Sequence, residues 1–362
     1  MDKVILPFLI SLLITIVSTP LAIIFAKKYK LVDNPRVRPH PAHVQKRIIP
    51  RAGGLPIYIG LIISILLFIP MDKHILGIIL AATLLLVIGL IDDVLKNFSP
   101  YPRLLMQIIA AGIIVISGTG ITFVTNPFGG ILRLDQFVFP VEFFGTHNII
   151  LLADLLAFIW IVWMMNMINW SKGVDGQMAG IVAVAALTIG FLSIKLFNQG
   201  DPNQLAIALL AFITSGVSLG FLIFNWFPSK IMPAFSGSSI LGLMIAVLSI
   251  LSGAKLATAL LVMLIPSVDF LYTFFRRIAS GKSPFLGDQQ HLHHLLLKAG
   301  WSHQRISLFY ISSCAILGLL ATSLSTEGKL FIALAVGVII LGTILWLNSF
   351  GHSFEQSDQD NG

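Results

Sequence analysis

The most constraining feature of this chain is a series of apolar runs, each long enough to cross a lipid bilayer. A helix needs about 20 apolar residues to span about 30 Å of hydrocarbon. Eleven such segments can be read, at about 4–26, 53–70, 75–91, 104–119, 148–165, 177–197, 204–224, 238–252, 255–275, 306–324 and 329–348. Only 11% of the 362 residues are charged, against about a quarter in soluble domains. The sequence predicts an all-α, polytopic membrane protein with about eleven transmembrane helices.

The apolar runs leave no room for a separate soluble domain. We predict one membrane-embedded domain over 1–348 and a polar cytoplasmic tail over 349–362. The segment 238–252 is short and the link to the next is tight, so one alternative merges or breaks these two segments. In the loop at 120–147, Gly129 and Gly130 precede an alternating run, which predicts a small hairpin.

The basic residues indicate the orientation of the chain. With the amino terminus outside, 17 of the 23 Lys and Arg residues fall inside, as the positive-inside rule requires. Lys27 and Lys28 follow the first span without a small-residue cleavage pattern, so that span is expected to remain as an anchor. We therefore read the net charge of +7 as orientation and not as nucleic-acid binding. The polar segments are expected to face the cytoplasm.

The first polar segment joins the first two spans. It holds Arg36, Arg38, His40, His43, Lys46, Arg47 and Arg51. One interpretation is a topology signal that also attracts anionic lipid head groups. The other is a phosphate-binding loop, because Gly53 and Gly54 let backbone amides approach a ligand beside the Arg51 guanidinium.

The second polar segment is the pair Asp92 and Asp93 at the inner end of the third span. Carboxylates at the carboxyl end of a helix oppose the helix dipole, so a compensating use is expected. Adjacent carboxylates suit a hard divalent cation, and their mutual repulsion can turn one of them into a general base.

The third polar segment spans 166–177. Asn166 and Asn169 are three residues apart and share a helical face, after which Gly173 and Gly176 end the helix and present Asp175. A simple cap and turn would give the same pattern. So much polarity directly after a lipid-embedded run favours a functional site.

Two further polar segments lie on the same side. The Gly/Ser-rich turn at 225–239 precedes a helix and can bind phosphate on backbone amides, or it is an ordinary interfacial turn. His291, His293 and His294 could suggest zinc, but on a helix they would point to at least two faces. Contact with a pyrophosphate is the better functional interpretation. The single Cys314 excludes a disulfide framework and a cysteine-built zinc site.

In this order, the five segments resemble those of the polyprenyl-phosphate N-acetylhexosamine-1-phosphate transferases, which include the undecaprenyl-phosphate GlcNAc-1-phosphate transferases of glycosyl transferase family 4. The likeness runs from about Leu31 to Tyr310. Its strongest pieces are Asp92-Asp93, the Asn-x-x-Asn-x-x-x-Gly-x-Asp-Gly run at 166–176 and the histidine run at 291–294. The chain departs from the family pattern at two acidic positions, which Lys172 and Phe235 occupy. Gln45 and Arg103 also depart from common family residues.

The resemblance implies transfer of a sugar 1-phosphate, GlcNAc-1-phosphate in the first instance, from a UDP-sugar to undecaprenyl or another polyprenyl phosphate. UMP is the leaving product, and the reaction begins a cell-envelope glycan pathway. The implied cofactor is Mg²⁺, which Lys172 and Phe235 call into question. The implied roles are catalysis by Asp92, Asp93 and Asp175, with Asp92 as the base; substrate binding by Arg51, Gly54, Asn166, Lys172, His291, His293 and His294; and metal ligation by Asp93, Asn169 and Asp175.

Three functional hypotheses follow. The first is an active transferase with an altered metal site, in which the Lys172 ammonium does part of the electrostatic work of the cation. The second is a catalytically impaired relative that binds lipid phosphate or assists assembly. The third is a transporter, for which Asp154 in the fifth span is the one obvious charged candidate. The expected partners are a UDP-sugar, polyprenyl phosphate and membrane lipids, without nucleic acid, and a homodimer is one arrangement left open.

Overall fold

The chain folds into a bundle of helices. The computed structural model describes residues 2–35, 47–95, 99–126, 129–142, 146–253, 255–284 and 288–360. Its helices are α1 (Asp2–Lys28), α2 (Gly54–Phe68), α3 (Lys73–Val94), α4 (Pro100–Ile116), α5 (Leu151–Trp170), α6 (Gln177–Asn198), α7 (Gln204–Asn225), α8 (Ala234–Leu251), α9 (Leu256–Val262), α10 (Leu264–Ala279), α11 (Leu292–Lys298), α12 (His303–Ser323) and α13 (Thr326–Asp360). The predicted all-α class is confirmed.

The helices account for every predicted span. Within the described ranges, eight helices are long and apolar enough to cross a membrane, and α9 with α10 makes a ninth if that bent pair is one span. The shorter apolar helices α2 and α4 fall on the second and fourth predicted segments. The chain is therefore a multi-pass membrane protein.

The break in the helical pattern lies inside the ninth segment and leaves α8 separate from α9. The two parts of this segment meet at an angle of 85°. Pro266 explains the position, because proline lacks an N–H and its ring clashes with the carbonyl four residues earlier. That carbonyl belongs to Val262, where α9 ends. Of the stated alternative, the merger of the eighth and ninth segments is therefore wrong, whereas a break is present within the ninth segment.

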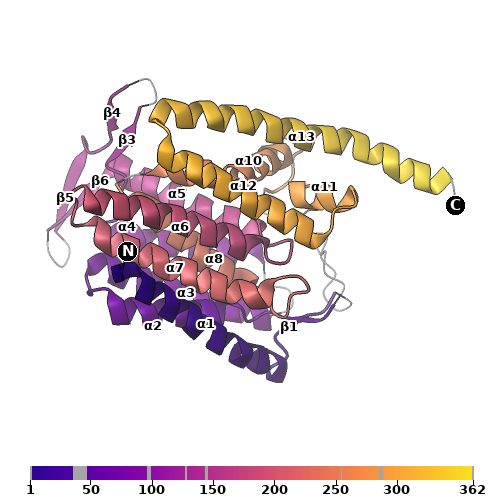
Figure 1. Ribbon diagram of the computed structural model, residues 1–362, viewed down its shortest axis with the longest axis horizontal. Helices are drawn as coiled ribbons and strands as arrows, with labels where there is room; N and C mark the ends of the chain where they lie inside the picture. The colour runs from indigo at the N-terminus through magenta and orange to yellow at the C-terminus, as the bar shows by residue number, and fades with distance from the viewer. Residues whose placement is uncertain are drawn as a thin grey trace.

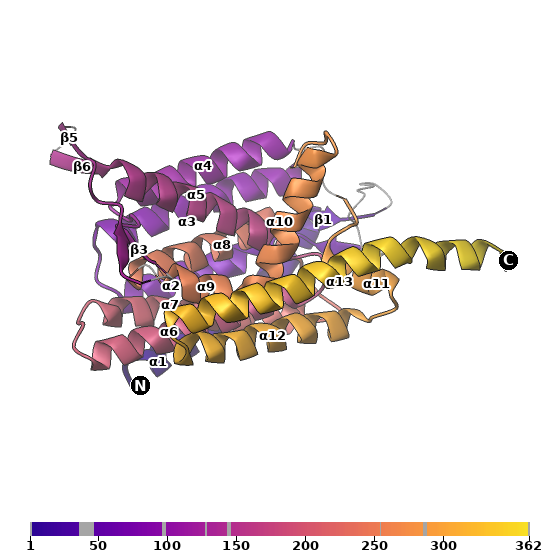
Figure 2. The ribbon, with the colours of Figure 1, turned by 90° about the horizontal axis from the view of Figure 1, so that it is seen from above.

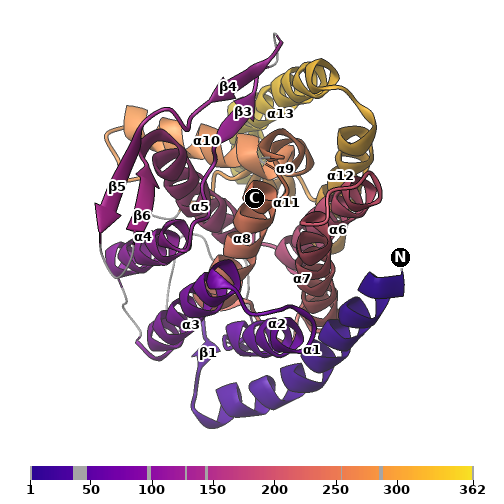
Figure 3. The ribbon, with the colours of Figure 1, turned by 90° about the vertical axis from the view of Figure 1, so that its left-hand side faces the viewer.

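Helix α8 forms the centre of the bundle, as the end-on view in Figure 3 shows. Every residue from Ala234 to Ile250 is buried, as expected for a helix that is apolar on all sides. Small residues let its neighbours approach. A Cβ on Gly242 would lie 2.7 Å from the Met165 Cα of α5, so only glycine fits at this crossing.

The two ends of the bundle differ (Figures 1 and 2). The amino terminus lies at one end with two hairpins, β3 (Phe123–Thr125) with β4 (Ile131–Arg133) and β5 (Val138–Glu142) with β6 (Thr146–Ile150). At the other end lie the carboxyl terminus and the short pair β1 (Val32–Asp33) with β2 (Ile49–Pro50). Opposite termini agree with an odd number of crossings.

The predicted hairpin in the 120–147 loop is confirmed as the pair β3 and β4. Phe123 pairs with Arg133, and Gly129 and Gly130 have φ values of 110° and 80°, which glycine adopts at little cost. The second hairpin in this loop has no counterpart in the predictions. The segment predicted as a polar tail begins inside α13, whose backbone stays helical to Asp360.

Candidate active site

The polar segments of the sequence come together at the end of the bundle that holds β1 and β2. Arg51 lies between β2 and α2, while Asp92 and Asp93 lie in the last turn of α3. Arg103 follows in the first turn of α4, and the loop after α5 brings Lys172. Because successive spans alternate in direction, segments far apart in sequence share this end.

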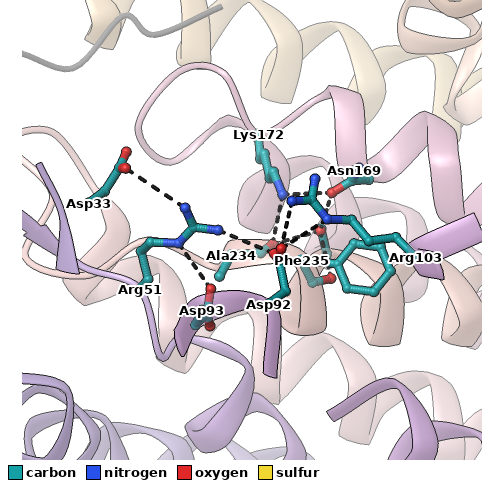
Figure 4. A network of polar contacts seen from close by, with 10 residues as sticks. Asp33, Arg51, Asp92, Asp93, Arg103, Asn169, Lys172, Ala234 and Phe235 are labelled. Carbon is teal, nitrogen blue, oxygen red and sulfur yellow. Dashed lines mark hydrogen bonds and ion pairs between the residues drawn. The ribbon is translucent and has the colours of Figure 1, made fainter. Parts of the chain in front are cut away.

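Figure 4 shows the first of two polar clusters, which we call the charged cluster: Asp33, Arg51, Asp92, Asp93, Arg103 and Lys172. Arg51 joins the two adjacent carboxylates. Its Nε donates to Asp93 Oδ1 at 2.9 Å and its Nη2 donates to Asp92 Oδ2 at 3.3 Å. Arg103 approaches from the other side and donates to Asp92 Oδ1 from Nε at 3.0 Å and from Nη2 at 2.6 Å.

Burial makes these ion pairs necessary. Asp92 is 1% exposed and Asp93 is 3% exposed, and a buried carboxylate without a partner would cost several kcal/mol. The Arg51 guanidinium also lies 3.8 Å from Asp33 Oδ1. Burial alone lowers the pKa of Arg51, but Asp93, Asp92 and Asp33 outweigh it and raise that pKa above its usual value. Three carboxylates and three cations make the charged cluster formally neutral.

Lys172 occupies a pocket of oxygen atoms. Its Nζ donates to Asn169 Oδ1 at 2.6 Å and to the Ala234 carbonyl at 2.9 Å. Phe235, the next residue of α8, is labelled in the same view in Figure 4. Burial, together with the nearby Arg51 and Arg103, lowers the pKa of Lys172 to about 7. One departure from the family pattern, Lys172, therefore binds the residue directly before the other, Phe235.

The second cluster, which we call the histidine cluster, consists of His291, His293 and His294 with Asp269. Its imidazole centroids lie 4.2 to 6.1 Å apart. The expectation that the histidines would point to different faces is wrong, because His291 is the extended N-cap of α11 and not part of the helix. Burial, and then the neighbouring His291, lowers the pKa of His294 to about 4. The ring is therefore neutral at pH 7 and offers hydrogen bonds, not charge.

Asp269 of α10 fixes the histidine cluster in place. One carboxylate oxygen lies 3.0 Å from His291 Nδ1 and the other accepts the Leu292 N–H at 2.7 Å. A proton on Nδ1 leaves Nε2 as the acceptor, facing Arg277 Nη2 at 3.5 Å. The Arg277 guanidinium stacks on Trp170, 4.7 Å from the ring centroid.

The two clusters meet through the loop after α5. Lys172 belongs to the charged cluster, and the next residue, Gly173, contacts His293 so closely that a Cβ would overlap the imidazole. Trp170 lies 5.4 Å from the His291 ring, between centroids. One short loop thus couples the two clusters, and a phosphate chain lying along it would meet both.

Other predicted site residues hold the scaffold together. Asp175 accepts from the Ser229 N–H at 3.0 Å and from its hydroxyl at 2.9 Å, and Arg47 lies 3.4 Å away. Asn166 donates back to the Val162 carbonyl of its own helix at 2.8 Å. Gly54 packs against Ser236, where a Cβ would overlap the hydroxyl.

The family resemblance implies a divalent cation in the site. The residues present fit such a cation poorly. Asp93 pairs with Arg51, the Asn169 oxygen accepts from Lys172, and Asp175 binds Ser229. In the described part of the chain, no three His, Cys, Asp or Glu side chains are grouped as metal ligands. The predicted ligand set of Asp93, Asn169 and Asp175 is not assembled, because Asp93 Oδ1, the Asn169 oxygen and both Asp175 oxygens already serve different partners. Among the described residues, only Asp93 Oδ2 of this set is buried without a hydrogen-bond partner.

Several contributors were not assigned a role from sequence. Asp269 was recognisable only as a carboxylate upstream of the histidines, and Ser229 only as part of a turn. The spacing of a buried acid in α10 and a histidine 22 residues later carries no local signal for contact. Of the basic loop, Arg36, Arg38, His40, His43 and Lys46 lie outside the described residues, as does Gln45.

Buried carboxylates bound to guanidinium groups, with an ammonium group close by at the end of an apolar bundle, are the features of a membrane enzyme that handles phosphates. Comparison with known proteins gives its family. Residues 75–253 match the model of glycosyl transferase family 4. The chain belongs to this family, so the predicted resemblance is confirmed.

Three relatives illustrate the range of the family. A decaprenyl-phosphate N-acetylglucosaminephosphotransferase of Mycolicibacterium smegmatis is 30% identical, over 92% of this chain and 85% of the relative. A probable undecaprenyl-phosphate N-acetylglucosaminyl 1-phosphate transferase of Bacillus subtilis is 30% identical, over 86% and 82%. A phospho-N-acetylmuramoyl-pentapeptide-transferase of Moorella thermoacetica is 28% identical, over 88% and 98%.

Proposed function

We propose that this protein transfers GlcNAc-1-phosphate from UDP-GlcNAc to a polyprenyl phosphate such as undecaprenyl phosphate, releasing UMP. The observation that carries the proposal is the gathering of Arg51, Arg103 and Lys172 around two buried carboxylates at one end of a membrane bundle. The relatives named above supply the substrate class. The product would be the first lipid-linked intermediate of a cell-envelope glycan.

The chemical step is an exchange of one phosphorus–oxygen bond. An oxygen of the lipid phosphate attacks the sugar-bearing phosphorus of the UDP-sugar and forms a new diphosphate. The bond from that phosphorus to the oxygen bridging to UMP breaks, and UMP leaves with the electron pair. If the attacking phosphate carries a proton, that proton passes to a base.

Asp92 is the proposed base and Arg51 and Arg103 are the proposed phosphate ligands. Both guanidiniums present donors to Asp92 in the structure, and substrate phosphates are the strongest competitors for those donors. When a phosphate takes them, Asp92 becomes able to accept the proton. Asp93 then keeps Arg51 oriented through its bond to Nε.

The histidine cluster is the proposed support for the diphosphate. His293 and His294 are buried and their pKa values are lowered by burial, so they act as neutral hydrogen-bonding groups. Arg277, next to His291, supplies charge. Asp175, Asn166 and Gly54 shape the loop and helix ends that carry these groups, and a direct catalytic role for Asp175 stays a prediction.

An open apolar groove of about 630 Å³ between α10 and α13 suits the isoprenoid chain of the acceptor. Leu271 and Phe275 line one wall, Leu334 and Val338 line the other, and Arg276 lies in the lining. The next residue of α10, Arg277, contacts the histidine cluster. The groove would thus lead a lipid phosphate toward the site.

A side chain placed in this groove tests its occupant. Gly337 of α13 faces it with only Val268 within reach of a Cβ, 3.9 Å away, so Gly337→Phe should raise the KM for polyprenyl phosphate by about fivefold. Gly342→Phe on the same helix is the matched control, because nothing lies within 4 Å of its Cβ. Equal KM values in both variants would remove the lipid chain from this groove.

The proposed setting is the plasma membrane of a bacterium, with the site in the cytoplasm and the amino terminus outside. The positive-inside bias of 17 against 6 basic residues supports this orientation. Cysteine labelling at exposed Tyr101, near the site, and at exposed Met71, at the other end, would test it from each side of the membrane. A homodimer is part of the proposal and is checked by mass measurement in detergent.

The direct test is transfer of radiolabel from UDP-GlcNAc to added polyprenyl phosphate in membranes that contain the protein. A labelled lipid that releases free GlcNAc on mild acid hydrolysis, as a sugar linked through its anomeric phosphate does, supports the proposal. Binding of polyprenyl phosphate without any transfer would instead indicate a catalytically impaired relative.

A further inference from the structure

We infer that Lys172 is a built-in cation that takes the place of the divalent metal in this site, so that phosphoryl transfer proceeds without Mg²⁺. The inference rests on the proposed function and concerns the electrostatic work within it. It follows from the position of one ammonium group, from its partners and from the charge balance around it.

The Lys172 ammonium lies where a bound cation would be expected. The Lys172 Nζ lies between Asn169 Oδ1 and the Ala234 carbonyl, at 2.6 and 2.9 Å. Ser238 donates to the same Asn169 oxygen at 2.8 Å. Amide and carbonyl oxygens are groups that bind hard cations, and here they bind an ammonium.

The formal charge of the charged cluster also favours a built-in cation. With aspartates at positions 172 and 235, as in the family pattern, five carboxylates would face two guanidiniums, a formal excess of three negative charges that calls for a divalent cation. The chain instead has Lys172 and the apolar Phe235. With Lys172 protonated, three carboxylates face Arg51, Arg103 and Lys172, and the charged cluster is formally neutral without any added ion.

The two departures from the family pattern, Lys172 and Phe235, compensate each other. Lys172 donates to the carbonyl of Ala234, the residue directly before Phe235. Phe235 is 2% exposed, so its ring fills the volume where a second carboxylate would stand. Replacement of one acid by a base and of the other by an apolar group removes negative charge and two acidic ligands from the site.

The ammonium is well placed to act on substrate. An ammonium carries three N–H donors, and within the described residues two of them meet Asn169 and Ala234. The third can meet an oxygen of the transferring phosphate. Fixed cations directed at a phosphoryl group stabilise the charge that develops during transfer.

Two measurements on the full-length protein in detergent or membranes test this inference. The first is transfer across a magnesium titration and in excess EDTA, for the native protein, Lys172→Met, Lys172→Asp and the control Lys27→Met, whose exposed lysine lies at the same end. The second is binding of Mn²⁺ by electron paramagnetic resonance, which needs no turnover.

The native protein should keep its rate in EDTA and bind no Mn²⁺ at the site. Lys172→Met should lose about 100-fold in rate, and Lys172→Asp should bind Mn²⁺ and transfer only with metal. Lys27→Met should match the native protein.

Native transfer that EDTA abolishes and Mg²⁺ restores, with Lys172→Met unaffected, would overturn the inference while leaving the proposed function intact. Absence of transfer by the native protein under all conditions would instead refute the function. The Mn²⁺ result would still decide the inference in that case, because site-specific Mn²⁺ binding by the native protein contradicts a built-in cation.

Discussion

The charged cluster and the histidine cluster lie on either side of one short loop and solve different problems. In the charged cluster, each buried carboxylate is held by a guanidinium, and Arg51 serves Asp92 and Asp93 together. In the histidine cluster, burial lowers the pKa of His293 and His294, and the rings are held by packing and by Asp269. The difference suggests that the first cluster governs the chemical step and the second positions the substrate.

The largest effect is expected in the charged cluster, from Asp92→Asn. A carboxamide keeps the shape of the side chain but cannot accept a proton, and it turns an N–H group toward the two guanidiniums. Loss of a general base costs about 10²- to 10⁴-fold in rate, so kcat should fall while the KM for UDP-sugar changes little.

The matched control for this variant is Asp72→Asn at the opposite end of α3. Asp72 is the N-cap and accepts from the Ile75 N–H at 2.8 Å, a role that asparagine fills equally well. Native kcat in Asp92→Asn would remove Asp92 from the chemistry and weaken the contrast between the clusters.

A smaller effect of another kind is expected from Asp269→Asn in the histidine cluster. The amide no longer forces the proton onto His291 Nδ1, so the ring can adopt the wrong tautomer and release Arg277. A hydrogen bond to a charged group contributes about 1.5 to 3 kcal/mol, which corresponds to about 10- to 100-fold.

We expect this loss to appear mainly as a raised KM for UDP-sugar. Asp269→Glu should recover part of the affinity, because it restores a carboxylate near His291. A pure fall in kcat with unchanged KM would show that both clusters act on the chemical step.

The smallest effect is expected from Gly173→Ala, in the loop between the clusters. The added methyl group overlaps His293, and relief of such overpacking costs about 1 kcal/mol or more, or roughly fivefold in kcat/KM. Gly112→Ala in α4 is the control, since its Cβ would meet nothing within 4 Å. If both variants behave like the native protein, the loop does not couple the clusters.

The sequence predicted the elements better than their junctions. Long apolar runs produced helices wherever they were expected, since a chain in lipid must satisfy its backbone hydrogen bonds internally. A break in the eighth or ninth segment was one stated alternative, but its position before Pro266 was not predicted, because a proline can also be accommodated in a membrane helix by its neighbours.

The candidate site was predicted in part. Asp92, Arg51 and the histidine run were identified because charge is expensive in an apolar chain. The pairing of Arg103 with Asp92 and of Asp269 with His291 was not, since these contacts join different helices and depend on how the helices cross.

The sequence by itself determined that lipid is the main solvent of the chain, that the fold is helical and that the polar segments share one end of the molecule. Each of these follows from the transfer free energies of local segments. The family resemblance also implied that Lys172 and Phe235 stand at two acidic positions. Only the tertiary structure decided that the Lys172 ammonium lies between the oxygens of Asn169 and Ala234, next to Phe235 in the chain. That juxtaposition depends on α5 crossing α8 closely, which a pattern along one chain cannot specify.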